Sequence, residues 1–70
     1  MNGLKRCLRS AGMRQVDLAQ KLGVSDAAVS AWIQGMYMPK AELLPRIAEL
    51  LGCRIEDLYG DYTQEEDDKP

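Results

Sequence analysis

The sequence contains no histidine, no phenylalanine and only two cysteines, Cys7 and Cys53, among its 70 residues. Without histidine, and with the cysteines in no C-x-x-C pair, the chain has none of the ligand clusters that hold zinc, so we expect no metal and no cofactor. It also shows no pattern of paired buried carboxylates and no glycine-rich phosphate loop. These absences argue against an enzyme.

Long apolar runs are missing as well. No stretch approaches the ~20 residues that span a bilayer, and the amino-terminal MNGLKRC has no apolar segment typical of a signal peptide. We therefore expect a cytoplasmic protein that makes no membrane contact. In that reducing compartment Cys7 and Cys53 are expected to stay free thiols that act as small apolar core groups, and a disulfide between them is the alternative.

Aromatic residues make up only 6% of the chain and prolines number three, whereas 46% of the residues are hydrophobic. An aliphatic-rich composition with widely spaced glycines favours a compact all-α fold over a β-sandwich or a disordered chain. A chain of this length forms one small domain that buries about 60% of the surface of its unfolded form. The core is therefore expected to be modest.

Charge is distributed unevenly along the chain, although the net charge is only −2. Residues 1–22 carry five cations against one anion, a balance of +4, and residues 23–52 have a balance of −1. From residue 53 onward two cations face seven anions, a balance of −5. A basic front is thus joined to an acidic end. We predict a folded domain over residues 1–60 and a disordered acidic tail over residues 61–70.

Apolar residues recur at helical spacing in five segments of the chain. The spacing predicts helices over residues 3–11, 15–22, 26–34, 41–51 and 55–59. A glycine follows each of the first four segments, which suits the left-handed residue that ends many helices. Ser25 is a suitable N-cap for the third helix. Pro45 is tolerated only in the first turn, so the fourth helix is expected to start near Ala41 or later.

The inward-facing residues of these helices are expected to form the core. They are Leu4, Cys7, Leu8, Ala11, Leu18, Ala19, Leu22, Val24, Val29, Trp32, Leu43, Leu44, Ile47, Ala48, Leu51, Ile55 and Leu58. Among them, the spacing of Ala19, Val29 and Trp32 around Gly23 is the most informative. Two helices joined steeply by a three-residue turn need a small residue where they cross, here Ala19, and a positive φ in the turn, here at Gly23. This is the helix-turn-helix pattern.

Residues 4–59 resemble the Cro and phage-repressor type of helix-turn-helix proteins. The segment RQVDLAQKLGVSDAAVSAWIQG is similar to the two central helices of that family, and IAELLGCRIEDLYG to its last two. The resemblance implies a compact five-helix, lambda-repressor-like domain, usually dimeric, that controls transcription at short inverted-repeat operators in double-stranded DNA. It also implies that Gln15 bonds a backbone phosphate and that helix 26–34 lies in the major groove.

Several residues of helix 26–34 lie opposite Val29 and Trp32 or in the exposed first turn, given a rotation of about 100° per residue. These candidate base-contacting residues are Asp26, Ala27, Ser30, Ala31 and Gln34. The alanines suit thymine methyl groups, Ser30 can serve several bases, Gln34 suits adenine, and Asp26 suits the N4 amine of cytosine. The alternative is structural: Asp26 stabilises the helix dipole, and Ala27 and Ala31 are good helix formers on a solvated face.

Helix 26–34 carries no cation. None is required within the groove, because phosphate contacts supply most of the affinity for DNA and base edges supply the discrimination. Beside Gln15, the candidate phosphate contacts are Arg9, Arg14, Lys21, Ser25 and Lys40. A basic first helix is by default an ordinary solvated face, and Ser25 is by default only a cap, so these roles depend on the neighbouring motif.

Three positions depart from the family pattern. Arg14 stands where Ser or Thr is common, which removes a helix cap and adds a cation, Met36 stands where Lys or Arg is common, and Ile33 where Glu often stands. Together with Tyr37 and Met38, these last two residues give residues 33–38 an apolar edge that suits a protein partner. The alternative is a loop folded back onto the core.

The expected function is that of a sequence-specific DNA-binding transcriptional regulator, a repressor of phage or bacterial type that binds as a homodimer. Dimerisation is implied by the resemblance, and the expected interface is Ile55, Leu58 and Tyr59 in the last helix. The alternative function is a protein-interaction module, such as an antitoxin, that binds a partner through residues 33–38 or the acidic tail. The tail is otherwise a solubilising extension or an internal competitor for the DNA-binding face.

Overall fold

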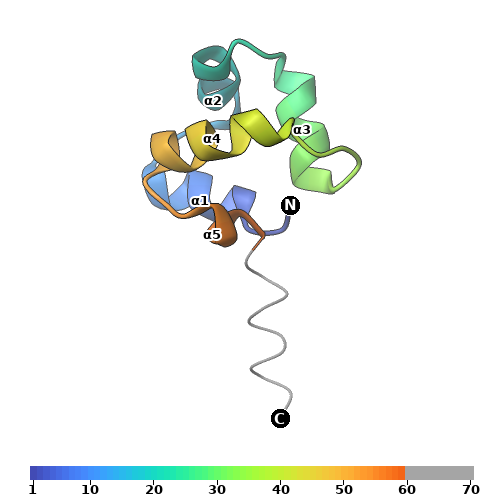
Figure 1. The fold of residues 1–70 in the computed structure, drawn as a ribbon. Helices are drawn as coiled ribbons and strands as arrows, with labels where there is room; N and C mark the ends of the chain where they lie inside the picture. The colour runs from blue at the N-terminus through green and yellow to red at the C-terminus, as the bar shows by residue number, and fades with distance from the viewer. Residues whose placement is uncertain (60–70) are drawn as a thin grey trace.

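Five α-helices form at the segments where apolar residues recur at helical spacing (Figure 1). In the computed structural model, which describes residues 1–59, they are α1 (Leu4–Ala11), α2 (Gln15–Leu22), α3 (Asp26–Gln34), α4 (Leu44–Leu51) and α5 (Ile55–Tyr59), with a 3₁₀ helix, η1 (Ala41–Leu43), directly before α4. The predicted all-α, five-helix fold is confirmed. The prediction of a disordered acidic tail lies outside the described residues.

Helix boundaries follow from local chemistry with small corrections. The first helix begins at Leu4, one residue later than predicted, because Gly3 is its N-cap. Pro45 lies at the second position of α4, in the first turn, where its missing N–H deprives the helix of no hydrogen bond. The preceding turn, η1, is closed by a hydrogen bond of 2.8 Å from the N–H of Leu43 to the carbonyl oxygen of Lys40.

Helix α4 occupies the middle of the fold, where it contacts α1, α2 and α5 (Figure 1). α2 packs chiefly against α3, to which it is joined by the three-residue turn 23–25. Gly23 has φ = 75°, a left-handed conformation in which its N–H donates to the carbonyl oxygen of Gln20 at 3.2 Å. A residue with a Cβ would be strained there, so glycine is what allows α3 to leave α2 so sharply.

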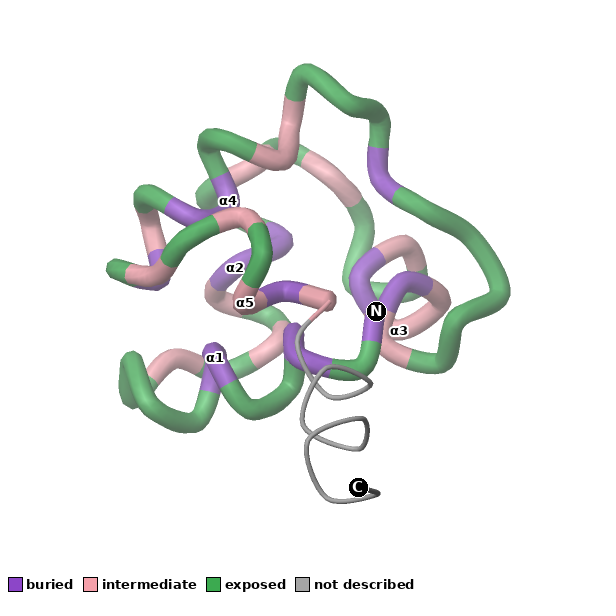
Figure 2. The backbone as a smooth tube through the Cα atoms, turned by 60° about the horizontal axis from the view of Figure 1, so that its bottom comes forward, coloured by how far each residue is buried: buried purple, intermediate pink, exposed green. Residues whose placement is uncertain are grey.

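Each helix contributes buried residues to one hydrophobic core (Figure 2). The buried hydrophobic residues are Met1, Leu4, Cys7, Leu8, Leu18, Ala19, Val29, Trp32, Ile47, Ala48, Leu51 and Leu58. The predicted burial of Val29 and Trp32 is confirmed, and Leu22 and Val24 pack against the core while remaining half-buried. The prediction for Ala11 was wrong: it is the last residue of α1 and is exposed, whereas Leu8 in the same turn is buried.

The segment before α1 holds α5 in place. The N–H of Gly3 donates to the carbonyl oxygen of Leu58 at 2.9 Å, and a Cβ at Gly3 would overlap the carbonyl oxygen of Asp57. The amino group of Met1 donates to the carbonyl oxygen of Trp32 at 3.0 Å in a buried position near the end of α3. Residues 1–3 therefore bind both α3 and α5 to α1.

Within residues 1–59, no helix has both the length and the apolar character that crossing a bilayer requires. In the same part of the chain, no three side chains of the His, Cys, Asp and Glu types come together as a metal site would need.

Both cysteines are free thiols, and they line the same hollow, between α1, the end of α4 and Asp57 of α5. Cys7 is buried, and its Sγ donates to the carbonyl oxygen of Asp57 at 3.7 Å. Burial raises the pKa of Cys53 from its ordinary value near 9 to about 12, with smaller contributions from a hydrogen bond with Cys7 and from nearby negative charge. Cys53 thus stays protonated where an ordinary thiol ionises.

This pKa predicts slow alkylation of Cys53. The thiolate is the reactive form, so at pH 9 the folded protein should react with iodoacetamide about 100-fold to 1000-fold more slowly than the same chain in urea. The rate should keep rising about tenfold per pH unit up to pH ~12, whereas that of a free thiol levels off near pH 9. Mass spectrometry of the 53-containing peptide measures both rates. Equal rates in the folded and unfolded chains would contradict the pKa shift.

The same shift has a consequence for stability. Between about pH 9 and 12, the folded state keeps a proton on Cys53 that the unfolded chain gives up. The free energy of unfolding therefore falls as the pH rises through this window, and Cys53 makes no such contribution below it.

Candidate nucleic-acid interface

The start of α3 is built around a capped first turn. The hydroxyl oxygen of Ser25 accepts a hydrogen bond of 3.0 Å from the N–H of Ala28, so the predicted N-cap is confirmed. Asp26 follows as the first helical residue and is exposed, which places its carboxylate at the positive end of the helix. The hydroxyl hydrogen of Ser25 is still available to a phosphate, its predicted contact.

Gln15 and Asp26 are linked across the helix-turn-helix. The side-chain amide nitrogen Nε2 of Gln15 donates to Oδ1 of Asp26 at 3.1 Å and to its backbone carbonyl oxygen at 3.3 Å. A glutamine amide has two N–H groups and both acceptors here belong to Asp26, so Gln15 must give up one of these bonds to reach its predicted phosphate. The link orients the Asp26 carboxylate, and it joins a predicted phosphate contact directly to a predicted base contact.

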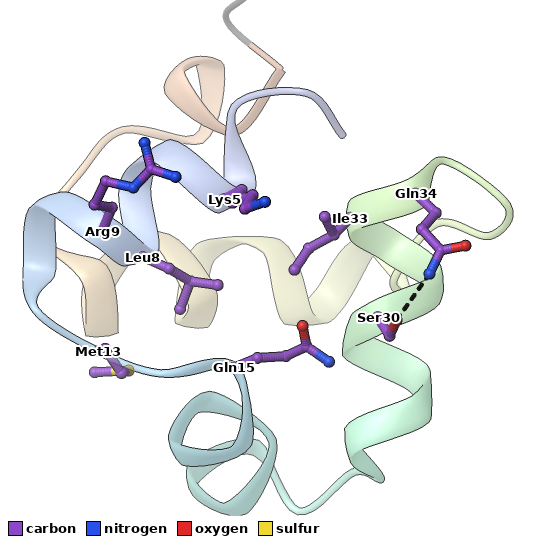
Figure 3. Close-up of a pocket in the computed structure, with 8 residues that line it drawn as sticks. All are labelled: Lys5, Leu8, Arg9, Met13, Gln15, Ser30, Ile33 and Gln34. Atoms are coloured by element: carbon purple, nitrogen blue, oxygen red, sulfur yellow. Dashed lines mark hydrogen bonds between the residues drawn. The ribbon is translucent and has the colours of Figure 1, made fainter.

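A groove lies between α1 and α3 (Figure 3). We call it the α1–α3 groove; it is lined by Lys5, Leu8, Arg9, Met13, Gln15, Ser30, Ile33 and Gln34. Lys5 and Arg9 come from α1 on one side, Ser30 and Gln34 from α3 on the other, and Gln15 extends toward α3 from the start of α2 (Figure 3). The amide Nε2 of Gln34 donates to the hydroxyl oxygen of Ser30 at 2.9 Å.

Among residues 1–59, the charged side chains that line the α1–α3 groove are both positive. They are Lys5 and Arg9, which are exposed, and no carboxylate of that part of the chain lines the groove. The wall formed by α3 offers neutral hydrogen-bonding groups, the hydroxyl of Ser30 and the amide of Gln34. An anion can therefore approach the α1 side while an uncharged polar ligand is contacted from the α3 side.

Lys5 is the residue that sequence reasoning missed. It belongs to the basic first helix but is not among the predicted phosphate contacts. Its spacing of four residues from Arg9 puts the two cations on one face of α1, and this was the available signal. That this face borders α3 follows only from the packing of α1 on α3.

Arg14 is engaged in an ion pair. Its guanidinium donates to the two carboxylate oxygens of Asp17, from Nε at 3.0 Å and from Nη2 at 3.1 Å, and Asp17 also accepts from the backbone N–H of Arg14 at 3.2 Å. Hydrogen bonds from Arg14 lower the pKa of Asp17, and the same interaction raises that of Arg14. Asp17 thus satisfies the backbone N–H of Arg14, as an acidic residue at the third helical position does in a capping box. The N–H of Asp17, which a Ser or Thr hydroxyl would accept, donates instead to the carbonyl oxygen of Arg14 at 3.0 Å. The ion pair with Asp17 competes with the phosphate contact predicted for Arg14.

The other predicted site residues divide into two groups. Asp26, Ala27 and Ala31 lie on α3 outside the lining of the groove, Asp26 and Ala27 exposed and Ala31 half-buried. Lys21 lines a hollow at the end of α2, together with Gln20. Lys40 lines a separate hollow before α4, together with Met38. The structure therefore brings Arg9, Gln15, Ser30 and Gln34 into one place and leaves the two lysines at the periphery.

The loop after α3 projects from the surface, and its backbone is mostly exposed (Figure 2). Met36, Tyr37 and Met38 have 65%, 67% and 54% of their surface exposed. The alternative of a loop folded back onto the core was therefore wrong for these three residues. Ile33, the remaining member of the predicted apolar edge, is half-buried and packs against the core.

The predicted dimer residues are less accessible than expected. Leu58 has no exposed surface, because α5 turns it toward α1 and α4, so a second copy cannot touch it unless α5 moves. Ile55 and Tyr59 are half-buried and pack against the core.

Comparison with known proteins agrees with this architecture. A family model described as "Helix-turn-helix" matches residues 4–58. An uncharacterised HTH-type transcriptional regulator of Methanocaldococcus jannaschii is 40% identical over 58 residues, which cover 83% of this chain and 88% of that protein. An uncharacterised HTH-type transcriptional regulator of Archaeoglobus fulgidus is 40% identical over 48 residues, or 69% of each chain. No solved structure gives a significant match.

Proposed function

The chain belongs to the helix-turn-helix family of Cro and phage-repressor type, a family of DNA-binding transcriptional regulators, and on this premise we propose that it is a sequence-specific repressor. It binds a short inverted repeat in double-stranded DNA as a homodimer, with α3 in the major groove, and occludes a promoter. Occlusion requires only tight binding to a DNA site that overlaps the promoter, which a domain of this size can provide.

The α1–α3 groove is the observation that carries this proposal. It sets two exposed cations, Lys5 and Arg9, beside the uncharged polar wall of α3. In this arrangement Lys5, Arg9 and Gln15 bind the phosphates that border the major groove, while α3 enters it. Lys21, Lys40, Ser25 and Arg14 contact phosphates farther out.

Base discrimination is assigned to α3. Gln34 pairs with adenine, Ser30 orients Gln34 through their 2.9 Å hydrogen bond, and Ala27 and Ala31 contact thymine methyl groups. Asp26 accepts a hydrogen bond from an exocyclic amine, that of cytosine N4, and disfavours any position where a phosphate or a base acceptor faces it. Gln15 holds the carboxylate at the orientation this requires.

Selection of bound duplexes from a random DNA pool, at 50 mM and 200 mM salt, tests the proposal. We expect an inverted repeat to be enriched, and affinity for it to fall by about 10³-fold or more between the two salt concentrations if six or more phosphates are contacted. Failure to enrich any motif would contradict sequence-specific binding.

Two variants separate the roles within the same experiment. Gln34→Ala should change the preferred base at one or two positions of each half-site, because it removes a base contact. Gln15→Ala should weaken binding to all sequences by a similar factor, because it removes a phosphate contact. Equal losses on every sequence from both variants would refute this division of roles.

A further inference from the structure

Cys7 and Cys53 are brought together by the fold, although they lie far apart in the chain. Cys7 is on α1 and Cys53 is in the turn between α4 and α5, and both line a hollow with a volume of about 270 Å³, which we call the Cys7–Cys53 hollow. The two thiols also share a hydrogen bond. Neither cysteine lines the α1–α3 groove, so the DNA-binding site leaves this sulfur pair unused.

Both thiols carry their protons in the folded chain. The Sγ of Cys7 donates to the carbonyl oxygen of Asp57 at 3.7 Å. Burial, with the hydrogen bond to Cys7 as a smaller cause, raises the pKa of Cys53 to about 12. A ligand that uses both sulfur atoms must therefore displace two protons, which only a strong sulfur-binding ion does.

The small number of ligands narrows the choice of ion. Zinc takes four ligands from Cys, His, Asp and Glu, and within residues 1–59 no three such side chains come together. Magnesium and calcium require several oxygen ligands. Thiolates select soft ions such as Cu(I), which is stable with two sulfur ligands in a line. With metal–sulfur bonds of about 2.3 Å, a linear unit separates its sulfur atoms by about 4–5 Å. Two thiols that already share a hydrogen bond need to move little to form it.

We propose that the Cys7–Cys53 hollow binds one Cu(I) ion between the Sγ atoms of Cys7 and Cys53. On binding, two copper–sulfur bonds form, two sulfur–hydrogen bonds break, and both protons pass to the solvent. No electron is transferred, and copper stays in the +1 state. One positive charge enters and two protons leave, so the site changes from neutral to a charge of −1.

The charged groups around the hollow can accommodate this change. Arg6 of α1 lines the hollow and supplies a positive charge, and Asp57 of α5 lines it as well. The carboxylate of Asp57 accepts a hydrogen bond from the N–H of Arg54 at 3.0 Å and lies 3.9 Å from the guanidinium of the same residue. Arg54 thus balances part of the negative charge of Asp57, and Arg6 faces that of the bound thiolates.

A copper titration of the full chain is the first test. Under anaerobic conditions, Cu(I) is supplied as its coloured bicinchoninate complex, and the loss of colour measures its transfer to the protein. We expect one ion per chain, and an affinity that rises about 100-fold per pH unit near neutrality, because two protons are released. A wild-type chain that takes up no Cu(I) would overturn the proposal. So would a chain that instead becomes 2 Da lighter, because that mass loss indicates a disulfide.

Two variants assign the ligands in this titration. Cys53→Ser removes one of the two sulfur ligands at a half-buried position, and it should lower the affinity at least about 100-fold. Ser10→Ala is the matched control, because Ser10 lines the same hollow without a sulfur atom, and it should bind within about twofold of wild type. If Cys53→Ser binds as tightly as wild type, the two sulfur atoms do not form one site.

Thermal unfolding with and without one equivalent of Cu(I) gives a second measurement. The unfolded chain also has both thiols, so the midpoint rises only if the folded state holds the ion more tightly. We expect a rise for wild type and for Ser10→Ala, and none for Cys53→Ser. An unchanged or lower midpoint for wild type would show binding to thiols without a formed site, and would contradict the proposal. Neither measurement uses DNA, so a failure here is separate from a failure of the proposed function.

Discussion

Replacing Lys5 and Arg9 together by glutamate is expected to lower the affinity for every duplex by about 100-fold or more at 0.15 M salt. Both cations line the α1–α3 groove, and no carboxylate of residues 1–59 lines it with them. Loss of two phosphate contacts alone accounts for about 30-fold, from the counterions that are no longer released, and the new carboxylates add repulsion. The dependence of log affinity on log salt should also become less steep, by about two contacts.

The measurement is fluorescence anisotropy with a random-sequence duplex and with the selected operator, at several salt concentrations. Arg46→Glu/Arg54→Glu is the matched control, because it changes the net charge equally at two exposed residues that lie outside the groove. If the two double variants lose affinity equally, total charge is responsible and the groove is not the phosphate-binding surface.

Gly3→Ala is expected to be the most destabilising glycine-to-alanine change within residues 1–59. The new Cβ would overlap the carbonyl oxygen of Asp57, and it faces backbone, which cannot rotate out of the way. Either α5 moves away, with loss of the hydrogen bond to the Leu58 carbonyl and exposure of the Leu58 side chain, or residues 1–3 detach. Overpacking of this kind costs about 3 kcal/mol, a large part of the stability of so small a domain.

Thermal unfolding followed by circular dichroism measures this effect, and the midpoint should fall by roughly 12–24 °C. Gly23→Ala is the control, since the chemical change is the same but the cause of strain differs. Its Cβ meets open space, and only the left-handed φ of 75° opposes it, at about 1–2 kcal/mol. A midpoint for Gly3→Ala within a few degrees of wild type would show that the contact of residue 3 with α5 is not needed for stability.

Most of the helices could be predicted because their signals are local. The glycines that end α2 and α3 and the cap at Ser25 act on the residues next to them. The predictions that were wrong concern the burial of single residues, which depends on how the helices pack against one another. Ala11 matched the apolar spacing of α1 but is exposed at the end of that helix. The burial of Leu58, which argues against a role in dimerisation, became clear only from the packing of α5 against α1 and α4.

Part of the candidate site could be predicted from the sequence, because the face of a helix also depends on local geometry. The face of α3 follows from the rotation of a helix, so Asp26, Ser30 and Gln34 could be named. The bond from Gln15 to Asp26 joins residues 11 positions apart, and the pairing of Arg14 with Asp17 competes with its predicted phosphate contact. The three-residue spacing of Arg14 and Asp17 was an available signal for their pairing, whereas the bond from Gln15 to Asp26 depends on how α2 packs against α3.

Composition, periodicity and the positions of glycine were enough to establish a helical domain with a helix-turn-helix at residues 15–34, since these features depend on interactions within a few residues. The crossing angles of the helices determined which faces lie side by side and which residues are buried or exposed. They brought the Lys5 and Arg9 face of α1 to the side of α3, buried Leu58, and left Met36, Tyr37 and Met38 exposed. Those angles result from the packing of the whole core, in which side chains far apart in the chain must fill one volume together.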